Sequence, residues 1–180
     1  MFTTLDGVVA DPDGTDGTAG GGWAFRHGPG AVAGDKFQLG ETLDNAVLLF
    51  GRRTWQLFTR IWPARSDEFS TRMNAVDKLV VTRTGVDPSI WSNSTVIDGD
   101  LIECVRFERA RRDVIIIGSI SVIRELQRHN LVDEYRLLTF PSVLGAGERL
   151  FAADGPAVQL RCTHAEQPDV AVLTWFEVTR

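Results

Sequence analysis

Two short apolar runs, each ended by a glycine, dominate the hydrophobic pattern of this chain. They are Ala46–Phe50, followed by Gly51, and Val114–Ile117, followed by Gly118, and a helical pattern begins directly after each glycine. Unbroken apolar runs of this length are typical of parallel strands that helices cover on both faces. The pattern therefore predicts two strand–glycine–helix junctions in a buried parallel sheet.

The remaining periodicity divides most of the chain into further strands and helices. Apolar runs predict strands at Phe2–Ala10, Lys78–Thr84 and Ser94–Ile97. Apolar residues at helical spacing predict helices at Asp35–Asn45, Arg52–Ile61, Asp67–Ala75, Leu101–Arg111 and Ser119–His129, with Asn130 as the C-cap of the last. Strands that alternate with helices in this way favour an α/β fold with a mostly parallel sheet.

The last third of the chain has a different pattern. Glu134–Leu144, Ala157–Thr163 and Val170–Thr179 are consistent with long strands, and both faces of the last one are rich in apolar residues. We therefore expect the parallel sheet to finish in a C-terminal antiparallel hairpin. No internal repeat and no linker composition interrupts the chain, so we expect residues 1–180 to form a single domain.

The segment Asp11–Gly34 breaks every periodicity. It contains eight of the 17 glycines and two prolines, so it cannot form a regular element. Loops of this length inside a compact domain are typically lids or disordered insertions. Trp23 and Phe25 favour a lid, because they give the loop apolar side chains with which to dock, although an insertion without a role stays open.

Composition excludes several classes of protein. A formal net charge of −5 argues against general nucleic-acid binding, so an anion site would have to be local. No apolar run approaches the roughly 20 residues that span a bilayer, and the N-terminal residues lack the pattern of a secretory signal. The two cysteines and three histidines have no metal-ligand spacing, so we expect no metal site, free thiols and a cytoplasmic location.

The two glycine junctions are candidate anion sites. Helix N-termini carry partial positive charge and unpaired amides, and here Arg52, Arg53 and the Thr54 hydroxyl follow the first glycine. Two arginines at the positive end of a helix are mildly unfavourable unless an anion binds there. Gly118–Ser121 forms the second candidate site. An ordinary helix start with solvated arginines is the alternative.

Two further positions could carry chemistry. Arg83 follows Thr82 at the expected end of a parallel strand, the edge at which such sheets bind ligands. Arg83 could hold the 2′-phosphate that distinguishes NADP from NAD, and a surface arginine is the alternative. Asp35 directly follows the glycine-rich segment and could donate a proton from a cleft, or it could simply cap the helix expected there.

These motifs resemble those of dihydrofolate-reductase-like proteins. Gly51–Trp55, Thr82–Arg83 and Ile116–Ser119 occur in the order expected of that superfamily. The segment Leu131–Phe151 resembles the signature of the branch that includes the reductase domain of bacterial riboflavin biosynthesis. Thr4–Ala10 is similar to the first strand of that branch.

The resemblance implies a three-layer αβα fold, NADPH as the hydride donor and a homodimer. It implies that the pyrophosphate is held by Gly51, Arg52, Arg53 and Thr54 and that the adenine side is contacted by Thr82 and Arg83. A second phosphate site would be formed by Gly118, Ser119, Ile120 and Ser121. The nicotinamide would lie against Val9 and Ala10. Asp35 precedes Gly51 at a spacing that suits the acidic residue of dihydrofolate reductases.

We therefore expect an NADPH-dependent reductase that transfers hydride to a C=N or C=O bond of a pterin- or pyrimidine-like heterocycle. Asp35 would assist protonation of the acceptor, and residues 11–34 would exclude water. Three alternatives stay open. They are a 5-amino-6-(5-phosphoribosylamino)uracil reductase, a nucleotide-binding module without turnover, and a structural dimer built on the exposed C-terminal strands.

Overall fold

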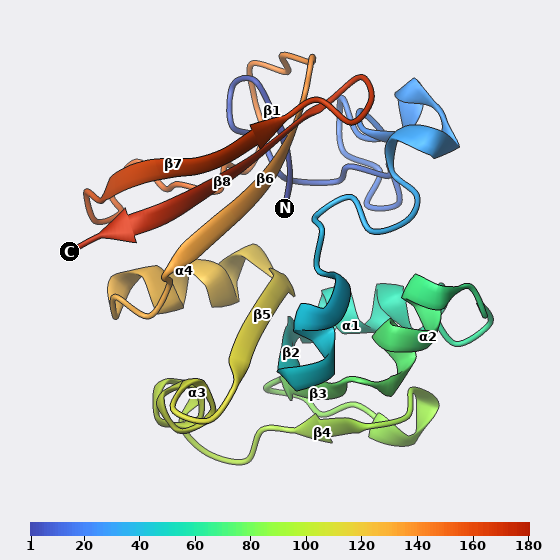
Figure 1. The fold of residues 1–180 in the computed structure, drawn as a ribbon, viewed down its shortest axis with the longest axis vertical. Helices are drawn as coiled ribbons and strands as arrows, with labels where there is room; N and C mark the ends of the chain where they lie inside the picture. The colour runs from blue at the N-terminus through green and yellow to red at the C-terminus, as the bar shows by residue number, and fades with distance from the viewer. The chain divides into compact units, whose positions relative to one another are not determined.

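The computed structural model describes residues 1–180 and divides into two compact units (Figure 1). Unit 1 comprises Met1–Gln38 and Val132–Arg180, and unit 2 comprises Leu39–Leu131. Each unit contains its own four-stranded sheet. No helix has the length and apolar character needed to cross a bilayer. That the whole chain acts as one domain stays a prediction.

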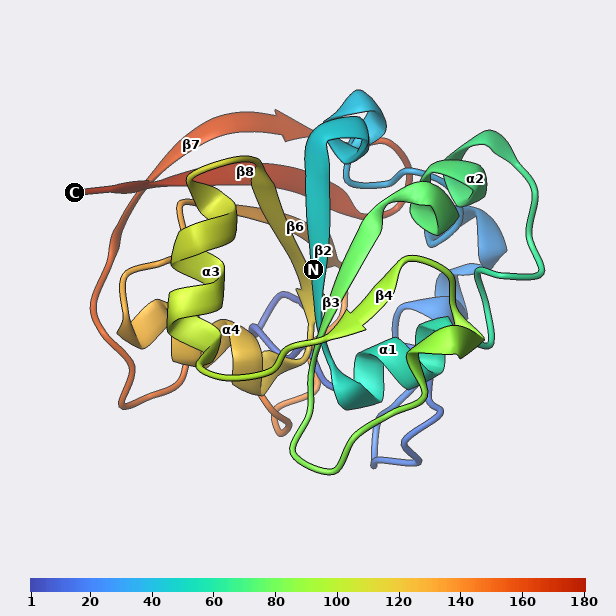
Figure 2. The same ribbon diagram turned by 90° about the horizontal axis from the view of Figure 1, so that it is seen from below.

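Unit 2 is built on a parallel sheet of strand order β4-β3-β2-β5. Its strands are β2 (Ala46–Gly51), β3 (Asp77–Val81), β4 (Ser94–Val96) and β5 (Asp113–Gly118). All three strand pairs are parallel, and Figure 2 shows β4, β3 and β2 side by side. The predicted parallel sheet is confirmed, and both strands that precede the glycine junctions are neighbours in it.

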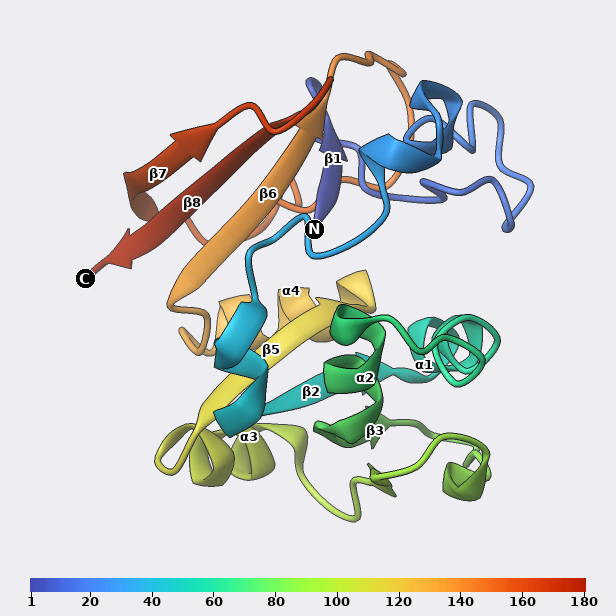
Figure 3. The same cartoon turned by 45° about the vertical axis from the view of Figure 1, so that its right-hand side comes forward.

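Helices cover both sides of this sheet. The elements are η3 (Gly40–Asn45), α1 (Arg52–Phe58), α2 (Glu68–Ala75), η4 (Pro88–Ile90), α3 (Leu101–Arg109) and α4 (Ile120–Arg128). Helix α1 packs on β2 and β3, whereas α4 packs on β2 and β5. Figure 3 shows α3 and α4 on opposite sides of the sheet, so unit 2 has the layered α/β/α arrangement that was predicted.

Burial follows the position of each strand in the sheet. Every residue of β2, the inner strand between β3 and β5, is buried, and Val47, Leu48, Leu49 and Phe50 are completely inaccessible. In β5, at the edge of the sheet, Asp113 is exposed and Val114–Ile117 are only half-buried. The apolar run of β2 is therefore explained by burial on both faces.

Lys78 is a buried cation in β3. The residue is 1% exposed, and its ammonium group donates to the carbonyl oxygens of Asn74, Val76 and Ser92 at 2.9, 2.6 and 3.1 Å. Its Nζ also lies 4.6 Å from the centroid of the Trp91 ring. Burial lowers the pKa of Lys78 to about 8. One side chain thus joins the end of α2 to β3 and to the segment before β4.

Unit 1 contains a mixed sheet of strand order β1-β6-β8-β7. Its strands are β1 (Phe2–Thr4), β6 (Glu134–Phe140), β7 (Gln159–Glu166) and β8 (Val172–Thr179). Strands β1 and β6 are parallel, whereas β6 with β8 and β7 with β8 are antiparallel. The predicted C-terminal antiparallel hairpin is therefore confirmed, but it belongs to this mixed sheet and does not finish the parallel sheet of unit 2 as was expected, because β8 pairs with β6 and β7 only.

The glycine-rich segment 11–34 packs against the sheet of unit 1. It contains two short helices, η1 (Phe25–His27) and η2 (Pro29–Ala31). Trp23, Ala24 and Ala31 are buried in one cluster with residues of β6 and β8, and the Trp23 indole donates to the Ala10 carbonyl at 2.9 Å. Phe25, by contrast, is 48% exposed. Trp23 therefore docks the segment, as the sequence suggested, and Phe25 does not.

Two predicted elements are wrong in extent. The first strand ends at Thr4, because Gly7 adopts a φ of 80° and Val8 folds back to accept a hydrogen bond from the Thr4 amide. The helix expected over residues 35–45 begins only at Gly40, as a 3-10 helix. The left-handed φ of 51° at Gln38 interrupts it.

The other predicted bounds shift by a few residues. Strand β3 stops at Val81, because the Thr82 hydroxyl accepts a hydrogen bond from the Thr84 amide and turns the chain. Strand β6 stops before Pro141, which has no amide hydrogen to donate. The C-cap of α4 is His129 and not Asn130 as predicted, because the helix ends one residue earlier; Asn130 follows the cap with a left-handed φ of 55°.

Candidate functional site

The two glycine junctions lie next to each other at the carboxyl edge of the unit 2 sheet. Phe50 of β2 is the register partner of Gly118 in β5, and Gly51 is the partner of Val81 in β3. Because these strands are parallel, the residues that follow them leave the sheet at the same edge. The positions predicted in unit 2 are therefore brought to one edge; they are Gly51, Arg52, Arg53, Thr54, Thr82, Arg83, Gly118, Ser119, Ile120 and Ser121.

The two junctions are in direct contact. A β-carbon on Gly51 would overlap the Ser119 Oγ and would lie 2.8 Å from the Ser119 Cβ. A β-carbon on Gly118 would lie 2.7 Å from the Thr54 Oγ1 in the first turn of α1. Both glycines are therefore required by close approach between the two chain segments. The peptide bond between Gly118 and Ser119 is cis.

Gly51→Ala is expected to lower the free energy of unfolding by about 2 kcal/mol, the usual cost of overpacking a tight site. The φ of Gly51 is −77°, so alanine fits the backbone and the cost comes from contact with Ser119. Adding Ser119→Gly should recover more than half of the loss, because the Oγ and Cβ contacts disappear.

Urea denaturation of the single and double variants measures both effects. Gly30→Ala is the control, because its β-carbon would meet nothing closer than 3.9 Å. A double variant that is no more stable than Gly51→Ala would show that Ser119 is not the source of the cost.

Basic and hydroxyl side chains surround the junctions. Arg52 donates to the Thr84 hydroxyl at 2.7 Å, so this bond joins the start of α1 to the turn after β3. Thr84 is a neutral partner, so the bond leaves the positive charge of Arg52 uncompensated. Arg53 and Arg83 are also exposed. Sequence reasoning missed the Thr84 contact, because Thr84 was expected to be the last residue of a strand over 78–84, whereas β3 ends at Val81.

The second junction adds two hydroxyls. Ser119 is the N-cap residue of α4, and its Oγ lies 2.9 Å from the Ser121 Oγ. Together with the arginines, these groups form a donor set suited to phosphate oxygens. No group of three or more histidine, cysteine, aspartate or glutamate side chains has the geometry of a metal site.

The other predicted site residues belong to unit 1. Val9 is 4% exposed, and its amide donates to the Glu148 carbonyl at 2.9 Å. The Ala10 carbonyl accepts the Trp23 indole N–H. Asp35 is half-buried, and its carbonyl accepts the Gln38 amide. The N-cap of η3 is Leu39, so Asp35 does not cap that helix and this alternative is wrong.

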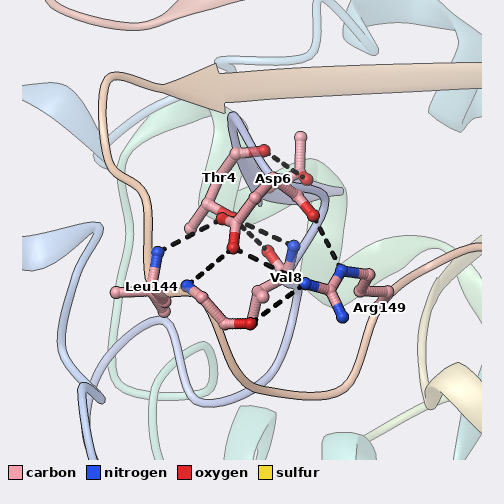
Figure 4. A network of polar contacts seen from close by, with 7 residues as sticks. Thr4, Asp6, Val8, Leu144 and Arg149 are labelled. Atoms are coloured by element: carbon pink, nitrogen blue, oxygen red, sulfur yellow. Dashed lines mark hydrogen bonds and ion pairs between the residues drawn. The ribbon is translucent and has the colours of Figure 1, made fainter.

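Asp6 organises the turn that precedes Val9 (Figure 4). Its carboxylate accepts hydrogen bonds from the Thr4 hydroxyl at 2.6 Å and from the amides of Leu144 and Gly145 at 3.3 and 2.8 Å. The Thr4 hydroxyl and these amides hold the pKa of Asp6 below its usual value. The sequence identified Asp6 as a turn residue but gave no sign of its partners more than 130 positions away.

Two surface hollows lie at the opposite, amino edge of the unit 2 sheet. Asn45, Asp77 and Arg112 line both of them. The Arg112 guanidinium donates to Asp77 at 2.6 Å and to Glu108 at 2.8 Å, so the charges there are paired. Ligands of parallel sheets bind at the carboxyl edge, and we therefore assign the candidate site to that edge.

Comparison with known protein families and sequences identifies relatives of this chain. The family described as RibD C-terminal domain matches residues 1–174. The uncharacterized protein YyaP of Bacillus subtilis (strain 168) is 29% identical over 112 residues, an alignment that spans 58% of this chain and only 58% of that protein.

Solved structures agree on the fold. A putative riboflavin biosynthesis protein from Shewanella sp. PV-4 superposes with a TM-score of 0.75 at 20% identity, covering 100% of this chain and 97% of that one. A pyrimidine reductase-like protein from Corynebacterium diphtheriae superposes with a TM-score of 0.66 at 14% identity, covering 99% of this chain and 90% of that one. A third structure, from Thermotoga maritima, superposes with a TM-score of 0.62 at 15% identity, covering 99% of this chain and 55% of that one. It is a diaminohydroxyphosphoribosylaminopyrimidine deaminase/5-amino-6-(5-phosphoribosylamino)uracil reductase. The predicted dihydrofolate-reductase-like fold class is confirmed.

Proposed function

Because this chain belongs to the RibD C-terminal domain family, we propose that it is an NADPH-dependent reductase of a small pyrimidine- or pterin-like heterocycle. The observation that carries this proposal is the pair of glycine junctions side by side at the carboxyl edge of unit 2. Such an edge is where open parallel sheets hold nucleotide ligands.

The donor set of this edge fits an anionic cofactor. Arg52, Arg53 and Thr54 would hold the pyrophosphate together with Ser119 and Ser121, whose hydroxyls lie at the adjoining junction. Thr82 and Arg83 would contact the adenosine side, with Arg83 on the 2′-phosphate. Gly51, Gly118 and Ile120 would contribute backbone, since the first two positions have no room for a side chain.

When bound, NADPH would supply a hydride to a C=N or C=O bond of the acceptor. The chain's own part would be to hold the reactants in contact and to keep water away. We propose that Val9 and Ala10 contact the nicotinamide ring and that Asp35 supplies a proton to the acceptor. We also propose a homodimer, which the family resemblance implies, and a cytoplasmic location, which fits the two free cysteines.

The neighbours favour a pyrimidine over a pterin acceptor, because one is described as pyrimidine reductase-like and another as a phosphoribosylaminouracil reductase. Loss of NADPH absorbance with dihydrofolate, a pterin and 5-amino-6-(5-phosphoribosylamino)uracil as acceptors tests the proposal. Turnover with any of them supports a reductase. Tight NADPH binding without turnover would favour a nucleotide-binding module, and no dinucleotide binding would favour a structural dimer.

Arg83→Ala is expected to weaken NADPH binding about tenfold while leaving NADH binding within about twofold, because a charge-assisted bond to the 2′-phosphate is lost. Isothermal titration calorimetry with both dinucleotides measures the two changes. Arg106→Ala is the control, since Arg106 pairs with Glu103 on the surface of α3. Equal losses for NADPH and NADH would exclude Arg83 as the reader of the 2′-phosphate.

A further inference from the structure

The signature segment 131–151 contains a loop that no part of the proposed cofactor site explains. This loop, residues 141–150, follows β6 and packs against the turn of residues 4–10 within unit 1. The Leu5 amide donates to the Ser142 carbonyl, the Val9 amide to the Glu148 carbonyl, and the Leu150 amide to the Gly7 carbonyl. The two segments are therefore held together at both ends of the turn.

Asp6 lies at the centre of this arrangement, as Figure 4 shows. Its carboxylate accepts the amides of Leu144 and Gly145 on one side and the Thr4 hydroxyl on the other. The same Thr4 hydroxyl oxygen accepts the Val8 amide at 2.9 Å. A continuous chain of hydrogen bonds thus runs from the 141–150 loop through Asp6 to the backbone of Val8.

Arg149 adds hydrogen bonds to the turn and to the 141–150 loop. Its guanidinium donates to the Asp6 carbonyl at 2.9 Å and to the Gly145 carbonyl at 3.2 Å. Val8 also approaches Gly147 so closely that a β-carbon there would lie 2.6 Å from the Val8 Cγ1. Side-chain bonds and close packing therefore fix Val8, and with it the two residues that follow.

We infer that Asp6 is a positioning residue that, through Thr4 and the 141–150 loop, fixes Val9 and Ala10 for contact with the nicotinamide ring. The inference rests on the proposed function, because it assigns a role toward the same cofactor. The Asp6 carboxylate is held by the Thr4 hydroxyl and by two loop amides, so its assigned role is to act through Val9 and Ala10.

The test compares the whole cofactor with a fragment that lacks the nicotinamide. Calorimetry with NADPH and with 2′,5′-ADP is carried out on the wild type, Asp6→Ala and Asp6→Asn. We expect Asp6→Ala to weaken NADPH about tenfold and to leave 2′,5′-ADP within about twofold, because only the nicotinamide contact is lost. Asp6→Asn should recover part of the loss, because its side-chain oxygen can still accept one of the loop amides.

Two further variants keep the test decisive. Asp87→Ala is the matched control, because the Asp87 carboxylate bonds to Ser89 in its own turn, and both affinities should stay unchanged. Arg149→Met tests the same arrangement should Asp6→Ala fail to fold, and it should show the same selective loss. The blue shift of bound NADPH fluorescence should shrink in Asp6→Ala, since this signal reports on the nicotinamide.

The outcomes separate the inference from the proposed function. Equal losses of NADPH and 2′,5′-ADP in Asp6→Ala would overturn the positioning role, since a general structural defect affects both. A wild type that binds NADPH no more tightly than 2′,5′-ADP would also overturn it, although the cofactor site would stand. A wild type that binds neither compound would instead contradict the proposed function.

Discussion

Lys78→Met is expected to lower the free energy of unfolding by about 3 to 5 kcal/mol, because buried carbonyl groups lose their partner. The ammonium of Lys78 bonds to three carbonyl oxygens from two separate segments, and methionine fills the volume without replacing any of these bonds. Its contact with the Trp91 ring is lost as well. Urea denaturation followed by tryptophan fluorescence measures the change.

Lys36→Met is the natural control, because Lys36 is the other lysine of the chain and is only half-buried. Its cost should stay within about 0.5 kcal/mol. A Lys78→Met protein as stable as the wild type would show that apolar packing at this position outweighs the three hydrogen bonds.

The same residue makes stability depend on pH. The folded pKa of Lys78 is about 8 and the ordinary value is 10.5, so between these values the unfolded chain binds more protons than the folded one. The free energy of unfolding of the wild type, relative to Lys78→Met, should therefore rise with pH across this window, by at most about 1.4 kcal/mol per pH unit. A flat difference would mean that the carbonyl bonds offset the effect of burial on the pKa.

Asp35→Asn is expected to lower kcat about 100-fold or more, the range attributed to a general acid, while the NADPH dissociation constant stays unchanged. Asparagine preserves the shape of the side chain but cannot donate an acidic proton. Steady-state rates with an acceptor that the wild type reduces, together with calorimetry, measure the two quantities.

Asp154→Asn is the matched control, because Asp154 is an exposed carboxylate in a loop of unit 1. It should leave both kcat and the NADPH dissociation constant as they are. Full turnover in Asp35→Asn would remove Asp35 from the mechanism and leave protonation of the acceptor to solvent or another group.

The sequence predicted best where burial on two faces decides the structure. The apolar run of β2, ended by Gly51, predicted a buried parallel strand, and the second run placed β5 in the same sheet, whereas their direct pairing was seen only in the structure. Helix α4 was equally clear, because its apolar residues Val122, Ile123 and Leu126 all lie buried on one face.

The sequence predicted least where single side chains decide the backbone. The turn after Thr4 depends on Gly7 and on hydrogen bonds to residues far along the chain, and neither leaves a periodic pattern. The start of η3 depends on the left-handed backbone conformation of Gln38. Glutamine rarely adopts this conformation, so the residue type did not indicate a break in the helix. In the candidate site, the two glycine junctions were predicted from the sequence, whereas the hydrogen bond from Arg52 to Thr84 was found only in the structure.

The anchoring of the glycine-rich segment constrains how an opening movement could occur. Trp23, Ala24 and Ala31 form part of the interior of unit 1, so swinging the whole segment outward would expose the same apolar surface that stabilises the fold. Any gate for substrate entry would have to move only those exposed parts of the segment that lie outside this cluster. Shortening the segment past that tryptophan would unfold the unit rather than leave the entrance open.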